Sequence, residues 1–242
     1  MRRRLILQAA VLLSAALPLL AQPGSSPRFV APPGDETRDA AAGIDRAVQA
    51  LTSGHATPSS VLSDPQYLPF HKWPRFRAAI RDHATREPLT IVTPAEPGPR
   101  LVLKGTVLDH GGKPTAGALV YVYQTSAKGW YSDEAAHVAA PAGDEHHARL
   151  FGYVLCDPQG RFEVRTIRPA GYPESTLPAH IHVEIGPGND DSRKAITEVQ
   201  FADDPRLTPE VRRLSLQAGF VITKVKRAAS GQEAVVELRT AQ

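Results

Sequence analysis

The spacing of hydrophobic residues differs between two regions of the chain. From residue 35 onward, apolar side chains recur every three or four positions, which predicts an amphipathic helix that ends near Gly54. The apolar positions of this helix are Ala41, Ile44, Val48 and Leu51. A second helix is predicted from Pro74, with Phe76 and Ile80 turned toward a core. The region 35–97 is therefore expected to form an N-terminal helical arm followed by a linker.

After the proline-rich stretch 94–99 the hydrophobic period changes to two, which is typical of β-strands. Residues 101–108 and 118–123 are predicted to form a hairpin around turn residues at 111–114. Further strands are expected over 151–156, 162–167, 180–185, 195–201, 220–226 and 234–239. Short strands without crossover helices between them predict a mainly β fold, an antiparallel β-sandwich over 98–242 with a short N-terminal helical arm.

The first 21 residues have the pattern of a secretory signal peptide. Three arginines at 2–4 precede an uncharged apolar run over 5–20, and Ala21 offers a small residue for cleavage. Residues 22–34 are rich in Pro, Gly and Ser and are expected to form a flexible leader. An uncleaved membrane anchor and a twin-arginine export signal are the alternatives. We expect an exported protein, periplasmic or extracellular, with no membrane association in its mature form.

Composition is that of a globular, turn-rich protein. Of the 242 residues 42% are hydrophobic and 22% charged, with 18 Gly and 22 Pro. The formal charge of +3 falls to zero when the three arginines of the signal are removed, so electrostatics gives no support for a nucleic-acid partner. The single cysteine, Cys156, excludes an intrachain disulfide. Its apolar neighbours favour a buried packing role over a nucleophile or a metal ligand.

Histidine and tyrosine carry the candidate chemistry, because the chain lacks a phosphate-binding glycine loop, a G-x-S-x-G elbow and an H-E-x-x-H motif. His180 and His182 are two positions apart in a predicted strand, so both imidazoles point to one face and can bind a single metal ion. Tyr131 and Tyr172 lie upstream, and each alone is as expected for a packing residue.

A cluster of acidic residues and histidines at 144–147 and the arginine at 149 are further candidates for a metal site and for substrate contact. The run Asp144-Glu145-His146-His147 contains metal-ligating residue types, but adjacent histidines diverge on an extended backbone, so a solvated loop is expected. Arg149 lies close to a strand beside the histidines. A surface or salt-bridge role is expected for it, with contact to a substrate as the alternative.

Four segments within 98–205 match, in order and in local sequence, a known family. They are Gly-Thr-Val-Leu-Asp at 105–109, Gly-Trp-Tyr at 129–131, Asp-Pro-Gln-Gly-Arg-Phe at 157–162 and Pro-Ala-His-Ile-His at 178–182. With these segments the chain resembles the intradiol ring-cleavage dioxygenases, the family of protocatechuate 3,4-dioxygenase and catechol 1,2-dioxygenase.

The resemblance implies a mononuclear non-haem Fe(III) held by Tyr131, Tyr172, His180 and His182. Phenolate oxygen is a hard anionic donor that stabilises ferric iron, and neutral imidazole completes the set. The resemblance also implies that a catechol displaces Tyr172, which takes up a proton, and that O₂ cleaves the ring between the hydroxyl-bearing carbons to a muconate-type diacid. A catalytically silent β-sandwich module that binds an aromatic or carbohydrate ligand is the alternative.

The chain departs from the pattern of this family at three places. Leu177 stands where the protocatechuate enzymes carry an arginine, Glu198 replaces a glutamine, and the segment 173–179 is short. Without a cation at position 177 to pair with a ring carboxylate, uncharged or bulky catechols are expected to be preferred over protocatechuate.

Overall fold

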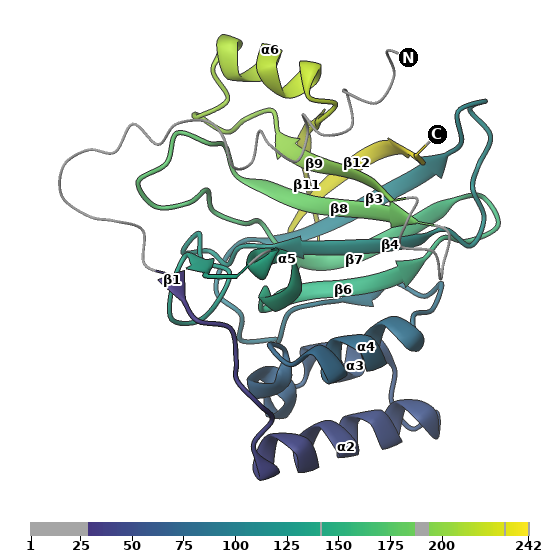
Figure 1. Ribbon diagram of the computed structural model, residues 1–242. Helices are drawn as coiled ribbons and strands as arrows, with labels where there is room; N and C mark the ends of the chain where they lie inside the picture. Colours follow the sequence, from purple (N-terminus) through teal and green to yellow (C-terminus); the bar gives the residue numbers. More distant parts are fainter. Residues whose placement is uncertain (1–28, 141, 187–193, 230, 242) are drawn as a thin grey trace, which may run out of the picture.

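The computed structural model describes residues 29–140, 142–186, 194–229 and 231–241. Two five-stranded sheets form a sandwich, and a layer of helices lies along one side of it (Figure 1). The predicted signal peptide, residues 1–21, and the leader up to residue 28 lie outside the described residues. No helix in the described ranges has the length and apolar character needed to cross a bilayer.

The strands divide between the two sheets as follows. The first sheet has the order β10 (Val221–Thr223), β9 (Ala195–Phe201), β8 (His180–Gly186), β4 (Leu119–Gln124) and β6 (Leu150–Leu155). The second has the order β11 (Val225–Ala228), β12 (Gly231–Arg239), β3 (Arg100–Leu108), β7 (Arg161–Ile167) and β2 (Leu89–Thr90). A short pair joins β1 (Phe29–Val30) to β5 (His137–Val138). The predicted mainly β sandwich with a helical arm is confirmed.

The predicted hairpin is wrong, because β3 and β4 belong to different sheets. β3 pairs with β7 and β12, whereas β4 pairs with β6 and β8. After an isolated bridge between Leu108 and Pro114 the chain crosses from one sheet to the other through Gly117, whose φ of 69° suits glycine. Alternation of apolar and polar residues shows which face of a strand is buried, but it does not name the neighbouring strand.

The segment predicted as one strand at 220–226 is two strands. β10 joins the first sheet and β11 the second, and the chain changes sheets at Lys224. Three pairings are also parallel within the otherwise antiparallel sandwich: β10 with β9, β12 with β3, and β2 with β7.

The helical arm contains both predicted helices. α2 (Arg38–Thr52) starts at Thr37, whose hydroxyl caps the helix by accepting from the Ala40 N–H at 3.2 Å, and α4 (Pro74–Asp82) starts at the predicted proline. Two short elements were not predicted, α3 (Pro58–Ser63) and the 3₁₀ helix η1 (Pro65–Phe70). Each has six residues, too few for the hydrophobic period to repeat.

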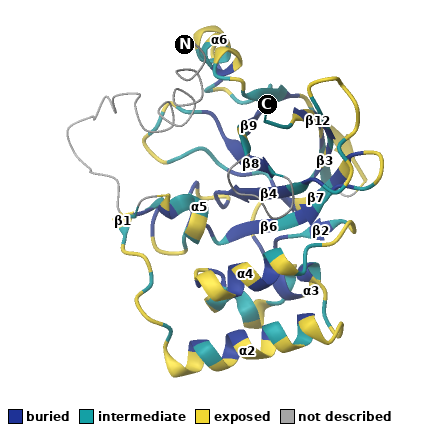
Figure 2. Cartoon of the chain, turned by 45° about the vertical axis from the view of Figure 1, so that its right-hand side comes forward, coloured by how far each residue is buried: buried dark blue, intermediate teal, exposed yellow. Residues whose placement is uncertain are grey.

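The arm covers the edges of both sheets. α2 packs on η1 and α4, while α4 contacts β6 and α3 contacts β2, which are the edge strands on that side. Figure 2 shows the buried residues concentrated within the sheets and between the sheets and the helices. Covered edges cannot pair with strands of another chain, so the arm protects the sandwich.

Two more helices follow later in the chain, α5 (Gly143–His147) and α6 (Pro209–Gln217). α5 contains the run Asp144–His147, so the prediction of a solvated loop there is wrong. The Asp144 carboxylate accepts from the Val138 N–H at 2.8 Å and contacts His137 Nδ1 at 2.7 Å. These bonds hold a helical turn that has no hydrophobic period.

Arg77 links the arm to the sandwich from inside the protein. Its side chain is buried, and its guanidinium lies 3.6 Å from the centre of the Phe151 ring. The guanidinium donates at 2.5–3.1 Å to the carbonyl oxygens of His71, Ala148 and Glu145 and to the Tyr121 hydroxyl. One buried cation thus joins α4, a strand of the first sheet and the segment around α5.

We expect Arg77→Leu to lower the free energy of unfolding by about 3 kcal/mol, because it leaves several buried acceptors without a donor. Arg75→Leu, two residues earlier in α4, is the matched control. Arg75 is exposed and pairs with Glu36 and Asp45, so its loss is expected to cost no more than about 1 kcal/mol. Denaturant titration of both variants measures the difference, and equal losses would contradict the linking role of Arg77.

Candidate metal centre

One face of the first sheet carries the two predicted histidines. His180 and His182 are alternate residues of β8, and the residues between and after them, Ile181 and Val183, are buried in the core. The neighbouring strand β9 places Gln200 beside His180 and Glu198 beside His182, and β4 places Tyr123 on the other side of His182. The alternation of the sheet therefore puts these side chains on one face, opposite to Ile181 and Val183.

The two predicted tyrosines come from separate loops that lie against each other. The Thr125 hydroxyl donates to the Ala170 carbonyl at 2.7 Å, and the Ala170 N–H donates to the Ser126 carbonyl at 3.1 Å. Gly129 has a φ of +77°, and a Cβ there would lie 2.3 Å from the Gly171 carbonyl oxygen. Glycine is therefore required where the two loops meet.

Tyr131 is held firmly in its loop. Its side chain is 1% exposed, its carbonyl accepts from the Arg149 N–H at 2.7 Å, and its N–H donates to the Ala136 carbonyl at 3.2 Å. The Arg149 guanidinium makes a two-pronged pair with Glu96 at 2.6 and 2.7 Å and contacts Asp133 at 2.7 Å. The expected salt-bridge role of Arg149 is thus confirmed, and the pair fixes the backbone behind Tyr131.

The four predicted residues bring their donor atoms together. The Tyr131 hydroxyl oxygen lies 2.7 Å from that of Tyr172 and 2.7 Å from His182 Nε2. His180 Nε2 closes the ring, at 3.0 Å from the Tyr172 hydroxyl and 3.0 Å from His182 Nε2. Two oxygens and two nitrogens thus surround one point, although their residues lie up to 51 positions apart in the sequence.

Burial sets the protonation of this ring of donors. Burial, and then the facing Tyr172, raises the pKa of Tyr131 well above its usual value, and burial also raises the pKa of the Tyr172 phenol. Burial, and then the neighbouring His180, holds the pKa of His182 well below its usual value. The phenols ionise here only beside a multivalent cation, whereas the imidazole is already in its neutral, ligating form.

The ring of donors fits a metal ion. Metal–nitrogen and metal–oxygen bonds are about 2.0–2.2 Å long, so donors at right angles on one ion lie about 3 Å apart, close to the spacing found here. His180 Nδ1 lies 2.8 Å from the Pro178 carbonyl, which can only accept, so Nδ1 carries the proton and Nε2 keeps its lone pair. Phenolate and imidazole donors together suit ferric iron.

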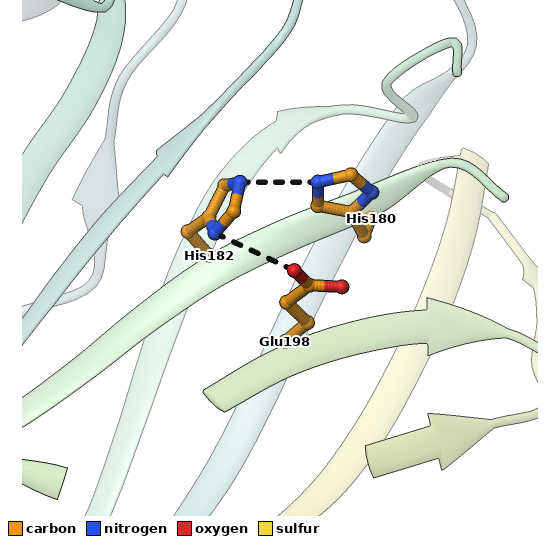
Figure 3. Close-up of side chains that lie close together, drawn as sticks. All are labelled: His180, His182 and Glu198. Carbon is orange, nitrogen blue, oxygen red and sulfur yellow. Dashed lines mark hydrogen bonds and ion pairs between the residues drawn. The ribbon is translucent and has the colours of Figure 1, made fainter. Parts of the chain in front are cut away.

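His180 and His182 also form a metal-type cluster with Glu198, in which the three ligand atoms lie within 4.8 Å of one another. Figure 3 shows that Glu198 faces one nitrogen of the His182 ring while His180 faces the other. The Glu198 carboxylate lies 4.0 Å from His182 Nδ1, whereas the tyrosine oxygens gather on the Nε2 side. We therefore regard Glu198 as a residue that orients His182, with the tyrosines as the closer oxygen donors.

Much of this chain is similar in sequence to known proteins. A family model described as Dioxygenase matches residues 73–240, a wider range than the 98–205 of the sequence resemblance. The β chain of protocatechuate 3,4-dioxygenase from Burkholderia cepacia is 32% identical over 162 residues, covering 59% of this chain and 65% of that protein. Catechol 1,2-dioxygenase from Acinetobacter baylyi is 33% identical over 124 residues, covering 45% of this chain and 38% of that protein. The chain belongs to the intradiol ring-cleavage dioxygenase family.

This family uses non-haem iron, in agreement with the donor set. The chain spans less than two thirds of the length of these two relatives. Catechol 1,2-dioxygenase from Pseudomonas arvilla C-1 superposes with a TM-score of 0.50 at 23% identity, over 65% of this chain and 56% of that chain. That likeness concerns the fold.

Two residues beside the ring of donors were not predicted from the sequence. The Tyr123 ring stacks on the His182 ring, with centroids 4.4 Å apart and planes 7° apart. The His137 ring lies 4.7 Å from that of Tyr172. The strand register of Tyr123 with His182 could have revealed the first contact, but no local pattern marks the second.

Cys156 lies away from these residues, in the core, and burial raises its pKa to about 12, as its predicted packing role requires.

Proposed function

We propose that this chain is an Fe(III) dioxygenase that cleaves a catecholic ring between its two hydroxyl-bearing carbons. The observation that carries the proposal is the ring of two phenol oxygens and two imidazole nitrogens at 2.7–3.0 Å spacing. Tyr131, Tyr172, His180 and His182 would hold the iron. When bound, the iron would act as a Lewis acid: it would draw electron density from a chelated catechol and so prepare the ring for attack by O₂.

The two tyrosines are suited to different roles. Tyr131 is fully buried and fixed through both of its backbone hydrogen bonds, so it would stay in place throughout the reaction. Tyr172 is only partly buried, and its carbonyl accepts longer bonds, from the Ser175 N–H at 3.4 Å and from Arg206 at 3.3 Å. Because burial raises the pKa of its phenol, a released Tyr172 phenolate is a strong base that would take the proton of a catechol hydroxyl.

The histidines would keep the site in shape. His180 is oriented by its bond to the Pro178 carbonyl, and His182 lies between the flat ring of Tyr123 and the Glu198 carboxylate. Both imidazoles therefore present Nε2 to the same point without rearrangement. The alternative of a catalytically silent binding module is not favoured, because the matching relatives are named dioxygenases.

The test is to purify the protein, load it with iron in air, and record its visible spectrum and its O₂ uptake with catechol. We expect a band from phenolate-to-Fe(III) charge transfer, and one O₂ consumed for each muconate-type diacid formed. Iron-loaded protein without that band and without O₂ uptake would refute the proposal.

We further propose that the chain is exported, on the basis of the basic residues at 2–4 and the apolar run over 5–20. The mature protein from its native host is then expected to begin near Gln22 or within the leader that follows. Intact-mass measurement checks this, and a soluble form that keeps Met1 would contradict it.

A further inference from the structure

A small cavity adjoins the metal centre. It has a volume of about 210 Å³. It lies between α6 on one side and, on the other, strand β9 and the residues that lead into β8. His180 belongs both to the ring of donors and to the wall of this cavity. A ring bound at the centre could therefore extend a substituent into it. The volume is below the roughly 300–1,000 Å³ of sites for drug-sized ligands, so that substituent would be short.

One part of the cavity wall is apolar and the rest is polar, with two carboxylates. Leu177, Leu214 and Phe220 form apolar wall, and Glu198 and Glu210 contribute carboxylates. Among the described residues, no lysine or arginine lines the cavity. A ligand in this cavity therefore meets acceptors and negative charge.

Gln200 adds an acceptor that has no partner. Its side chain is 3% exposed, and its Nε2 donates to Glu198 Oε2 at 3.1 Å. That bond fixes the amide so that Oε1 is the free end, and this buried Oε1 has no hydrogen-bond partner. The Gln200 amide therefore holds the Glu198 carboxylate in place beside the cavity.

The cation that contacts the Leu177 carbonyl is engaged with the backbone. Arg206 Nη1 lies 3.3 Å from the Tyr172 carbonyl and 3.5 Å from the Leu177 carbonyl, and Arg206 is not part of the cavity wall. It therefore supports the segment that carries Tyr172 and offers no partner to a carboxylate inside the cavity.

We propose that the preferred substrate is a catechol with a short side chain that ends in a protonated amine. An ammonium group is a positively charged hydrogen-bond donor, which matches the carboxylates of Glu198 and Glu210. A carboxylate in the same place would face two like charges. This inference rests on the proposed function and adds the substrate class.

Binding is tested first, without turnover, on the iron-loaded protein. The probes are three single phenols that differ at the end of the side chain: tyramine, 4-ethylphenol and 3-(4-hydroxyphenyl)propionate. Calorimetric titration is expected to give tyramine a dissociation constant lower than that of 4-ethylphenol by about tenfold, with the propionate weakest. Equal constants, or tightest binding of the propionate, would overturn the inference.

Turnover is tested next with dopamine, 4-ethylcatechol and 3-(3,4-dihydroxyphenyl)propionate. The same order is expected in kcat/KM. Cleavage of all three with the propionate best would overturn the inference and leave the proposed function standing. If none of the three is cleaved, and unsubstituted catechol is not cleaved either, the proposed function is refuted and the substrate assignment with it.

Two variants locate the effect. Glu210→Gln is expected to lower the ratio of tyramine to 4-ethylphenol affinity by roughly threefold to tenfold, because it removes one of the two charges. Glu237→Gln is the matched control, since it removes the same charge from an exposed position of β12 in the other sheet. The control is expected to keep the ratio. An unchanged ratio in Glu210→Gln, or an equal fall in both variants, would overturn the assignment.

Discussion

Tyr131→Phe is expected to remove most of the iron from the purified protein. The substitution deletes an anionic oxygen donor that is 1% exposed and lies 2.7 Å from both Tyr172 and His182. No other side-chain oxygen is positioned by the same loop at that point, so the affinity for iron should fall by more than about a hundredfold. Iron content after dialysis and the charge-transfer band measure the loss.

Tyr153→Phe is the control for this result. Tyr153 lies on β6 and stacks on Tyr121, outside the ring of donors, and it loses the same hydroxyl group. It should keep its iron and its band. Both variants should fold, because phenylalanine keeps nearly all the packing volume of tyrosine. Full iron content in Tyr131→Phe would contradict the assignment of Tyr131 as a ligand.

The histidine pair of this centre could be predicted from the sequence, but the convergence of the tyrosines with it could not. His180 and His182 lie on one face because a strand has a period of two, a local rule that needs no knowledge of the fold. Tyr131 and Tyr172 lie on loops 41 residues apart. Their meeting depends on the close approach of Gly129 and Gly171, and no hydrophobic period encodes it. Only the resemblance to a family placed them together.

The strand partners show a similar limit. The hydrophobic pattern of β3 and β4 correctly gave two strands, and the turn residues between them suggested a hairpin. The chain instead crosses between the sheets, because β3 finds its neighbours in β7 and β12, which come later in the sequence. Contacts at long sequence separation decide the pairing, and local patterns describe only the faces.

The helical arm contains a buried polar residue that the hydrophobic pattern of the sequence could not predict. The apolar face of α4 was predicted from Phe76 and Ile80, whereas Arg77 between them would be placed in solvent by any hydrophobic pattern. It is buried because the backbone carbonyls of Glu145 and Ala148, in one distant segment, accept its hydrogen bonds. Such a residue is recognised only when its acceptors are in place.

Tyr172→Phe is expected to separate iron binding from ring cleavage. Three donors of the ring remain in this variant, including the firmly held Tyr131, so it should keep part of its iron and a shifted charge-transfer band. The residue that would take up a catechol proton is lost, however, and the rate of ring cleavage should fall by about 10²–10⁴-fold. Spectral titration with catechol under nitrogen measures binding, and O₂ uptake measures cleavage.

The two tyrosine variants must differ if the tyrosines have different roles. Tyr172 is only partly buried, and its carbonyl accepts from the Ser175 N–H at 3.4 Å and from the Arg206 guanidinium at 3.3 Å, whereas the Tyr131 carbonyl accepts a bond of 2.7 Å. A ligand that leaves and returns needs the looser attachment. If Tyr172→Phe lost all its iron, or kept normal turnover, Tyr172 would not be the departing base. If Tyr131→Phe and Tyr172→Phe had the same iron content and the same rate of ring cleavage, the assignment of different roles to the two tyrosines would be wrong, even if all four ligands were assigned correctly.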